Sequence, residues 1–194
     1  MKNPSLIAII GLGNPDEKFT NSPHKAGFAV LDLLVKNQQV KFSKTKTALV
    51  ARVKDANREL LLVKPMTYMN KSGEAVKSIA AQHEIKTENI WLIHDDIDLP
   101  LGMIRIVKGR GAGGHKGVLS ILKVLKSKNV IRFRVGIRPK ALDDRRSPEM
   151  MNKFVTKPLA GTQKKRLEEA LLLCGKAVSA ALEGGIEGAM NEYN

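Results

Sequence analysis

The segment LIAIIGLGNP, residues 6–15, indicates how the chain begins to fold. Its first five residues, Leu6 to Ile10, are all apolar and stop at a glycine, a pattern typical of a strand buried on both faces. A loop rich in glycine, asparagine and proline follows, and the apolar spacing of FAVLDLLV, residues 28–35, predicts a helix. A buried strand followed by a loop and a helix is typical of an α/β domain.

The same alternation continues along the chain. We expect further strands over residues 40–53, 60–63, 90–93, 103–107 and 131–137, and further helices over residues 72–84 and 118–125. Thr162 is expected to cap a last helix that ends at Gly184-Gly185. Strands that alternate with helices predict an α/β fold with a largely parallel or mixed central sheet. No repeat or linker stands out, so we predict one domain over residues 1–194.

The composition excludes several classes of protein. With 43% hydrophobic and 27% charged residues, the 194-residue chain is suited to bury a core, which excludes extended disorder and a collagen-like repeat. No apolar run approaches the ~20 residues that cross a bilayer, and residues 1–6 lack the apolar region of a secretory signal. The single cysteine, Cys174, cannot form an internal disulfide and fits a reducing compartment. We therefore expect a soluble cytoplasmic protein without membrane contact.

Positive charge is concentrated in one part of the chain. There are 33 lysine and arginine residues against 19 acidic residues, and residues 99–160 alone have 15 basic and three acidic residues. This concentration predicts a surface that binds a polyanion, and nucleic acid fits it better than a membrane does. The plain alternative is a basic surface that only contacts solvent. Because only eight residues are aromatic, we expect no extended platform for base stacking.

Neither a nucleotide cofactor nor a metal ion is expected. GRGAGG, residues 109–114, matches the glycine fingerprint of dinucleotide-binding folds, but the basic segment IRFR, residues 131–134, stands where an acidic residue for the ribose belongs. We interpret these glycines as a loop that admits a phosphate backbone near a helix N-terminus. The histidines have no spacing typical of metal ligands; they are His24, His83, His94 and His115.

A few polar residues follow predicted strands, where α/β sheets build their sites. They are Asn14, His24, Asn70 and Asp95. The carboxylate of Asp95 could hold the imidazole of His24 in one tautomer, and the imidazole could then take a proton from water. The two asparagines could position an ester and its developing oxyanion. Each residue alone is also typical of a turn or a helix cap, so spacing leaves both interpretations open.

These residues lie in segments that together resemble bacterial-type peptidyl-tRNA hydrolase. The match runs nearly from end to end in ordered blocks: GLGNP (11–15), His24 with AG (26–27), KPMTYMNKSG (64–73), HDDIDLP (94–100) with Gly102, and GAGGHKG (111–117). The resemblance implies one α/β domain with a twisted mixed central sheet flanked by helices. It also implies an enzyme of translation that cleaves the ester joining a peptide to the terminal ribose of tRNA, without a metal or other cofactor.

The resemblance implies catalytic roles by position. His24 resembles the general base, and Asp95 resembles its partner. Asn14 and Asn70 resemble the residues that position the substrate ester and the 3′ end of the tRNA. No single spacing in the chain leads to these roles without the resemblance.

Further residues are implied to contact the tRNA. Met69 resembles an apolar wall beside the asparagines, and Arg134 matches a basic residue that binds the 5′-phosphate end of the acceptor stem. The set implied for substrate and tRNA binding is Phe19, Lys25, Met69, Lys108, His115, Lys116 and Arg134. The basic part of the chain fits this interpretation, because tRNA is a polyanion.

The chain departs from the family pattern at several positions. Lys25 and Lys116 each stand where the family usually has asparagine, and Phe19 stands where it usually has tyrosine. A phosphate-binding lysine of the family falls on Val107, although Lys108 is adjacent. A lysine donates hydrogen bonds but cannot accept them, so Lys116 cannot hold a water molecule as an amide carbonyl would. We expect these changes to affect the rate more than the fold.

We predict an enzyme that hydrolyses the ester bond of peptidyl-tRNA with His24 as the general base on water. Its partner is peptidyl-tRNA, and we expect a monomer. Two alternatives remain open. One is an RNA-binding protein on the same scaffold with little or no hydrolase activity, which the two added lysines and Pro23 favour. The other is a small hydrolase of a different ester or amide.

Overall fold

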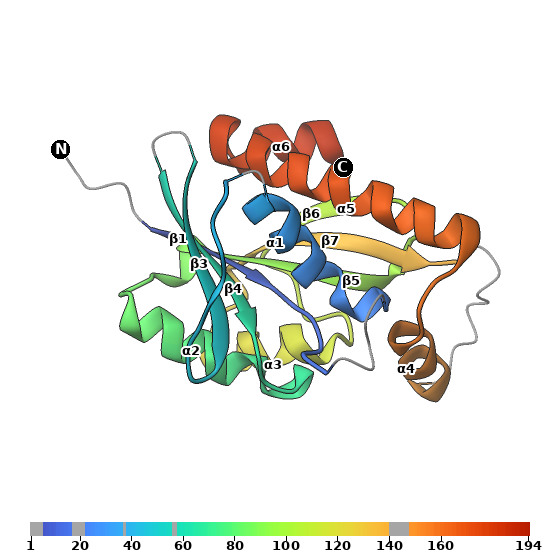
Figure 1. Cartoon of the computed structure of the whole chain (residues 1–194), viewed down its shortest axis with the longest axis horizontal. Helices are drawn as coiled ribbons and strands as arrows, with labels where there is room; N and C mark the ends of the chain where they lie inside the picture. Colours follow the sequence, from blue (N-terminus) through green and yellow to red (C-terminus); the bar gives the residue numbers. More distant parts are fainter. Residues whose placement is uncertain (1–5, 17–21, 37, 56–57, 140–147) are drawn as a thin grey trace.

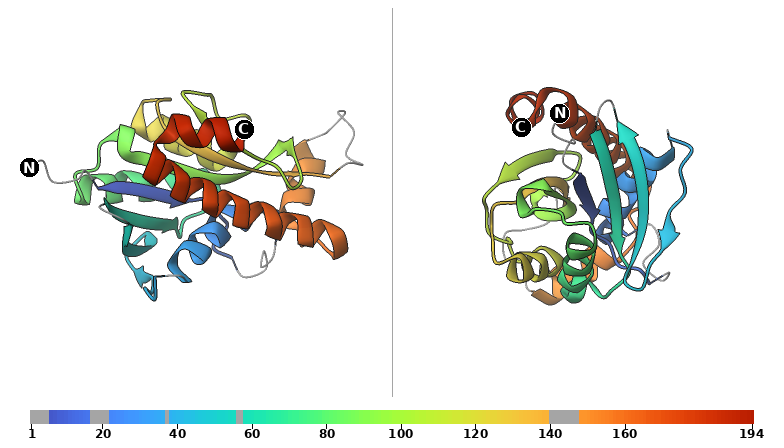
Figure 2. Two further views of the ribbon diagram at one scale, coloured as in Figure 1. Left: turned by 90° about the horizontal axis from the view of Figure 1, so that it is seen from above. Right: turned by 90° about the vertical axis from the view of Figure 1, so that its left-hand side faces the viewer.

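The computed structural model describes residues 6–16, 22–36, 38–55, 58–139 and 148–194. These residues form a seven-stranded sheet flanked by helices, which confirms the predicted α/β fold class (Figure 1). The strands are β1 (Ile7–Gly11), β2 (Ser43–Lys44), β3 (Ala48–Asp55), β4 (Arg58–Pro65), β5 (Ile90–Pro100), β6 (Ile104–Lys108) and β7 (Ile131–Arg138). Their order across the sheet is β2-β3-β4-β1-β5-β7-β6, and the sheet is twisted (Figure 2).

The sheet is parallel at its centre and antiparallel toward its edges. Strand β1 pairs in parallel with β4 and β5, and β5 pairs in parallel with β7. The pairs β2–β3, β3–β4 and β6–β7 are antiparallel. All five residues of β1 are buried, as expected for a central strand covered on both faces. The prediction of a mixed sheet is therefore confirmed.

Helices cover both faces of the sheet. Those in the described residues are α1 (Ala26–Lys36), α2 (Ser72–Gln82), α3 (Lys116–Leu125), α4 (Pro148–Thr156), α5 (Gly161–Gly184) and α6 (Ile186–Tyr193), with short 3₁₀ helices η2 (Pro23–Lys25), η3 (Met69–Lys71) and η4 (Thr87–Asn89). Helices α1 and α5 lie on one face, and α2 and α3 lie on the other (Figures 1 and 2). No described helix combines the length and the apolar character that a membrane span requires.

Each face of the sheet has its own apolar core. Ile93 of β5 packs with Leu31 of α1 and Val178 of α5. The neighbouring residue, Leu92, belongs to the opposite core with Ile121 of α3. Successive residues of a strand point to opposite faces, so β5 supplies side chains to both sides of the sheet.

Strand β5 is longer than the predicted strand over residues 90–93. It continues to Pro100 because its polar residues still pair with β7: His94 lies opposite Arg134, and Asp95 lies opposite Val135. The register shifts between Asp96 and Pro100. The candidate residues expected after the strand therefore lie within it.

Other element boundaries also differ from the predictions. The strand expected over residues 40–53 is broken into β2 and β3, because the backbone N–H and the hydroxyl of Thr45 both donate to the carbonyl of Ala48 in a turn. The predicted cap at Thr162 is wrong: α5 begins at Gly161, its N-cap is Ala160, and no side chain caps it. The end of α5 at Gly184 is as predicted. Helices α4 and α6 were not expected from the sequence.

The end of β1 creates an open position beside β5. The last residue of β1, Gly11, lies opposite Ile93, and the N–H of Leu12 donates to the carbonyl of Ile93 at 2.8 Å. Because β5 continues beyond this point, Asp95 has β7 beside it but has passed the end of β1. Side chains from both faces of the sheet can therefore reach Asp95.

Helix α1 approaches the strand ends through Gly27. A Cβ atom on Gly27 would lie 2.3 Å from the nitrogen of Leu12 and 2.4 Å from the carbonyl oxygen of Ile93. Only a residue without a side chain permits this approach. The contact holds η2, and with it His24, against the end of the sheet.

Replacing Gly27 with alanine should therefore overpack this junction. We expect Gly27→Ala to lower the free energy of unfolding by about 1–3 kcal/mol. The matched control is Gly175→Ala in α5, where a Cβ atom would meet nothing within 4 Å; it should raise the free energy of unfolding by about 0.5–1 kcal/mol, because alanine favours the helix. Urea denaturation measures both changes, and equal effects would contradict the close packing of α1.

Candidate active site

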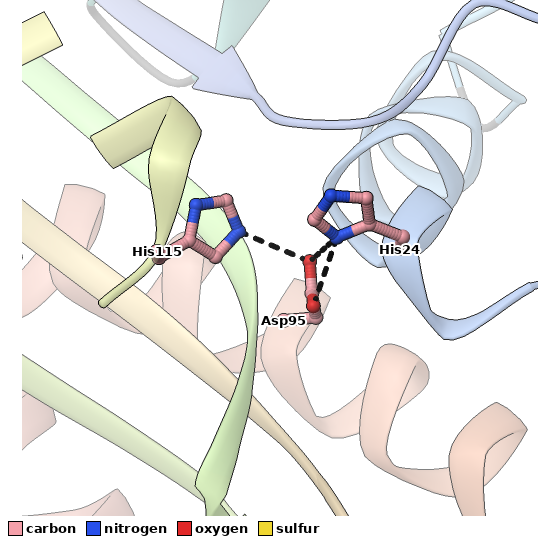
Figure 3. Close-up of side chains that lie close together, drawn as sticks. All are labelled: His24, Asp95 and His115. Atoms are coloured by element: carbon pink, nitrogen blue, oxygen red, sulfur yellow. Dashed lines mark hydrogen bonds and ion pairs between the residues drawn. The ribbon is translucent and has the colours of Figure 1, made fainter. Parts of the chain in front are cut away.

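Two imidazoles share the buried carboxylate of Asp95 at the open position beyond β1 (Figure 3). His24 Nδ1 lies 3.0 Å from Oδ1 and 3.1 Å from Oδ2 of Asp95. His115 Nε2 lies 3.2 Å from Oδ1. His24 comes from η2, which leads into α1, whereas His115 precedes α3 on the other face of the sheet. The structure thus joins two residues from opposite layers through one strand residue.

The helix that His115 caps determines which ring nitrogen of this residue carries the proton in the neutral form. Its Nδ1 accepts from the backbone N–H groups of Gly117 at 3.2 Å and Val118 at 3.3 Å. An atom that accepts two hydrogen bonds carries no proton, so the proton of the neutral ring is on Nε2. His115 therefore donates from Nε2 to Asp95. The sequence assigned this histidine to substrate binding, but its hydrogen bonds connect it to the carboxylate.

His24 has the opposite tautomer. Its Nδ1–H donates to Asp95, so Nε2 is the unprotonated ring nitrogen. Burial lowers the pKa of His24, but the charge and hydrogen bond of Asp95 raise it, and the charge of Lys116 lowers it; together they raise the pKa above the ordinary 6.5. The structure therefore brings His24 and Asp95 together, and the role of His24 as a general base stays a prediction.

Asp95 itself remains ionised. Burial would raise the pKa of Asp95, but the charges and hydrogen bonds of His24 and His115 lower it far below its ordinary value. A buried carboxylate is costly unless it is paired and hydrogen-bonded. The two imidazoles meet both requirements.

His94 is a further member of this cluster that the sequence did not assign. It is fully buried, and its Nδ1 donates to the backbone carbonyl of Asp95 at 2.7 Å. Its ring meets the ring of His115 edge to face, with centroids 4.8 Å apart. Burial and the nearby His115 lower the pKa of His94 to about 3, so this ring is neutral. Its position next to Asp95 in HDD was the one signal available in the sequence.

A cavity of about 350 Å³ opens beside this cluster. Its walls are formed by His24, Asp95, Asp96, Ile97, Gly113, Gly114, His115, Lys116, Met151 and Val155. Met151 and Val155 come from α4, which the sequence did not predict. The walls therefore combine imidazoles, carboxylates and one lysine with apolar side chains.

The candidate asparagines do not line this cavity. Asn14 follows β1, and its side-chain oxygen accepts from the backbone N–H of Asp16 at 3.1 Å. Asn70 is exposed in η3 after β4. The preceding residue, Met69, is buried, and its sulfur would lie 2.4 Å from a Cβ atom on Gly117, so it packs against the start of α3. Of the described residues, the cavity walls include neither asparagine.

Lys25 and Lys116, the two lysines that replace asparagines of the family pattern, line different cavities. Lys116 is the exposed first residue of α3 and lines the cavity with His24. Lys25 instead lines a separate cavity of about 350 Å³ with Asp32 and Leu159, between α1 and α5. The structure therefore brings Lys116, but not Lys25, into the wall beside His24. Phe19 lies outside the described residues.

A second, basic cavity of about 560 Å³ lies over β6 and β7. Its charged walls include Asp96, Arg105, Lys108, Arg110, Arg132 and Arg134. Lys108 and Arg134, which the sequence assigned to tRNA, are thus brought together here. The two cavities share Asp96 and Gly113 in their walls, so they adjoin one another.

The cluster of His24, Asp95 and His115 has the residue types of a metal site. Their nearest ligand atoms lie within 4.8 Å of one another. A neutral imidazole that binds a metal through Nε2 carries its proton on Nδ1. Nδ1 of His115 accepts two backbone N–H groups instead, so His115 does not fit this role. The histidines are separated in sequence, but three of them meet here as a hydrogen-bonded cluster.

Comparisons with known proteins give one consistent result. The family model for peptidyl-tRNA hydrolase matches residues 8–194. The peptidyl-tRNA hydrolase of Thermodesulfovibrio yellowstonii is 34% identical over 191 residues, which cover 97% of this chain and 99% of that protein. That of Fervidobacterium nodosum is 37% identical over 188 residues, covering 97% and 96%. The crystal structure of peptidyl-tRNA hydrolase from Acinetobacter baumannii superposes with a TM-score of 0.88 at 29% identity, covering 100% of this chain and 96% of that one.

Replacing Asp95 with asparagine should lower the pKa of His24. In the native site Asp95 raises this pKa; without the carboxylate, burial and the charge of Lys116 remain, and both lower it. A ¹H–¹⁵N NMR titration of the native protein and Asp95→Asn measures the change. His83, whose pKa is lowered by burial and by Arg52, is an internal control that should not move. A pKa of His24 that stays constant or rises would contradict the geometry.

Proposed function

The chain belongs to the peptidyl-tRNA hydrolase family and is an enzyme that hydrolyses the ester bond of peptidyl-tRNA; from this premise, we propose that His24, held by Asp95, is the general base. The observation that carries the proposal is the 3.0 Å hydrogen bond from His24 Nδ1 to Asp95 in the wall of a cavity. This bond leaves Nε2 to accept a proton from water. The alternative of an RNA-binding protein gains no support from it, since a buried imidazole–carboxylate pair adds nothing to phosphate affinity.

The reaction begins when His24 Nε2 takes a proton from water and the oxygen attacks the carbonyl carbon of the ester. Asp95 stabilises the imidazolium that forms, because its carboxylate accepts the Nδ1–H of that ring. The tetrahedral intermediate then collapses, and the bond to the ribose 3′ oxygen breaks. The imidazolium returns its proton to that oxygen. The products are a peptide with a free carboxyl group and a tRNA with a free 3′ hydroxyl.

Asn14 and Asn70 are proposed to position the ester and the 3′ end of the tRNA. Both follow parallel strands, β1 and β4, whose carboxyl ends meet at one edge of the sheet. An amide can donate to the oxyanion and accept from a ribose hydroxyl. The buried Met69 beside Asn70 supports an apolar surface for the same end of the substrate.

The basic cavity is proposed to hold a phosphate of the acceptor stem. Lys108 and Arg134 line it, and Arg132 is buried there with no hydrogen-bond partner for Nε among the described residues. A buried guanidinium with an unpaired N–H favours an anionic ligand. Together with Lys116 in the neighbouring cavity, these residues would bind the polyanion that the charge distribution predicts.

A single chain supplies every residue in this proposal. His24, Asp95 and His115 all come from one sheet and its flanking helices, so the proposed site needs no second subunit. We propose that the protein acts as a monomer of one domain, and that it acts in the cytoplasm on peptidyl-tRNA.

The first test is hydrolysis of N-acetyl-aminoacyl-tRNA in the presence of EDTA. We expect release of the acyl amino acid, because His24 and Asp95 act without a metal. His24→Ala and Asp95→Asn should each lower kcat/KM by about 10²–10⁴, the range for loss of a positioned general base. Release by His24→Ala at the native rate, or no release by the native protein, would overturn the proposal.

Lys116→Asn tests the cation in the cavity wall. The oxygens of Asp95 are hydrogen-bonded to imidazoles, and Asp96 in the same wall is paired with Arg134, so we propose that the substrate supplies the negative charge that Lys116 contacts. We expect KM to rise about two- to fivefold, the size of one exposed ionic contact. The pKa of His24 should also rise, because the charge of Lys116 lowers it.

The matched control is Lys123→Asn, which removes the same charge from an exposed site farther along α3. Its steady-state kinetics should equal those of the native protein. Equal effects of the two substitutions would mean that Lys116 contributes only to the net charge.

A further inference from the structure

Adjacent carboxylates of β5 serve different sites. Asp95 is bonded to His24 and His115, whereas Asp96 Oδ2 accepts from Arg134 Nε at 2.6 Å. Because neighbouring strand residues point to opposite sides, Asp95 is directed to the two imidazoles and Asp96 to Arg134. The mechanism above uses Asp95 and leaves Asp96 without a role.

Both oxygens of Asp96 are engaged. Oδ2 faces Arg134, and Oδ1 accepts from the backbone N–H of Asp98 at 2.9 Å. Burial would raise the pKa of Asp96, but the hydrogen bond and charge of Arg134 and the nearby His94 keep it below its ordinary value. The ionised carboxylate is therefore fixed to its own strand and to β7.

The bond through Nε constrains how Arg134 presents its guanidinium. The guanidinium of Arg134 has five N–H donors, and Asp96 accepts from the Nε–H, which is the donor nearest the aliphatic part of the side chain. The two terminal nitrogens remain, and they form the end-on pair that matches two oxygens of a phosphate. Arg134 lines the basic cavity, so a fixed stem would hold this pair in one orientation there.

Asp96 is also the acidic residue among the described walls of the basic cavity, which otherwise carry five basic side chains. Two of those, Arg132 and Arg134, lie on one strand, and Arg132 is 3% exposed. One carboxylate beside two guanidiniums neutralises only part of their charge and leaves positive charge for a ligand. Asp96 also lines the catalytic cavity, so the ion pair with Arg134 lies where the two cavities meet.

We propose that Asp96 is a positioning residue for phosphate binding. It holds Nε of Arg134 at the boundary of the two cavities. A phosphate bound by Arg134 then positions the ester beside His24. This inference rests on the proposed function and adds a residue that acts through Arg134. The competing role is that of a shield, in which Asp96 occupies Arg134 and weakens phosphate binding.

The test is a double-mutant cycle of Asp96→Asn and Arg134→Ala with N-acetyl-aminoacyl-tRNA as substrate. We expect Asp96→Asn to raise KM about tenfold, the loss expected for one charge-assisted hydrogen bond, with a smaller fall in kcat. In the Arg134→Ala background, Asp96→Asn should change KM no further, because its effect passes through that side chain. Glu88→Gln, an exposed charge loss in η4 before β5, is the control and should leave KM unchanged.

Three outcomes overturn the inference. A lower KM for Asp96→Asn means that Asp96 shields Arg134. An equal rise of KM in both backgrounds means a structural role that does not pass through Arg134. No change in KM means no role. If Asp96→Asn does not fold, Asp96→Glu replaces it in the cycle: it keeps the charge but moves the carboxylate by one methylene, and it should raise KM only where Arg134 is present.

Failure of the proposed function is visible separately. The native protein would then release no acyl amino acid, whatever the variants do. The same cycle is therefore also run on the dissociation constant of deacylated tRNA, which needs no turnover. Coupling between Asp96 and Arg134 in that constant supports the inference, and its absence overturns it.

Discussion

The site depends on one buried carboxylate held between two imidazoles. A buried ionised Asp95 would be unstable alone, and the donors that stabilise it come from opposite layers of the fold. They can meet because β1 ends at Gly11 while β5 continues, which opens the edge of the sheet at Asp95. The close approach of α1 at Gly27 and the capping of α3 by His115 fix the two donors. The packing of both helical layers and the proposed catalytic site are thus linked through one side chain.

The two cavities give a physical reason for the uneven charge of the chain. The basic segment of residues 99–160 supplies β6, β7 and the loop between β6 and α3, and these elements carry the arginines around the second cavity. Its only described acidic neighbour, Asp96, precedes that segment on β5. The cavity beside His24 is instead lined by two imidazoles, the carboxylates of Asp95 and Asp96, the lysine Lys116 and two apolar residues of α4. The sites that we propose for phosphate binding and for proton transfer are therefore separate cavities that share part of a wall.

How far the sequence predicts this structure depends on the kind of residue. Leu6 to Ile10 form a predictable strand because continuous burial leaves an apolar run. The extension of β5 was missed because its residues after Ile93 are polar, and they stay in the sheet through pairing with β7. The pair of His24 and Asp95 was foreseen from strand ends and family resemblance. The hydrogen bonds of His115 to the start of α3 and to Asp95 were not foreseen, since helices are usually capped by serine, threonine, aspartate or asparagine.

The central claim is that the imidazole of His24, neutral and held by Asp95, is the base that takes the proton from water. It is tested most directly by comparing two pKa values of the native protein in one buffer: that of His24 from NMR titration, and that of the free enzyme from the pH dependence of kcat/KM. We expect kcat/KM to rise with pH through a midpoint that equals the NMR value and lies above the ordinary 6.5 of histidine. A midpoint that differs from the pKa of His24, or a rate that falls as His24 loses its proton, would contradict it.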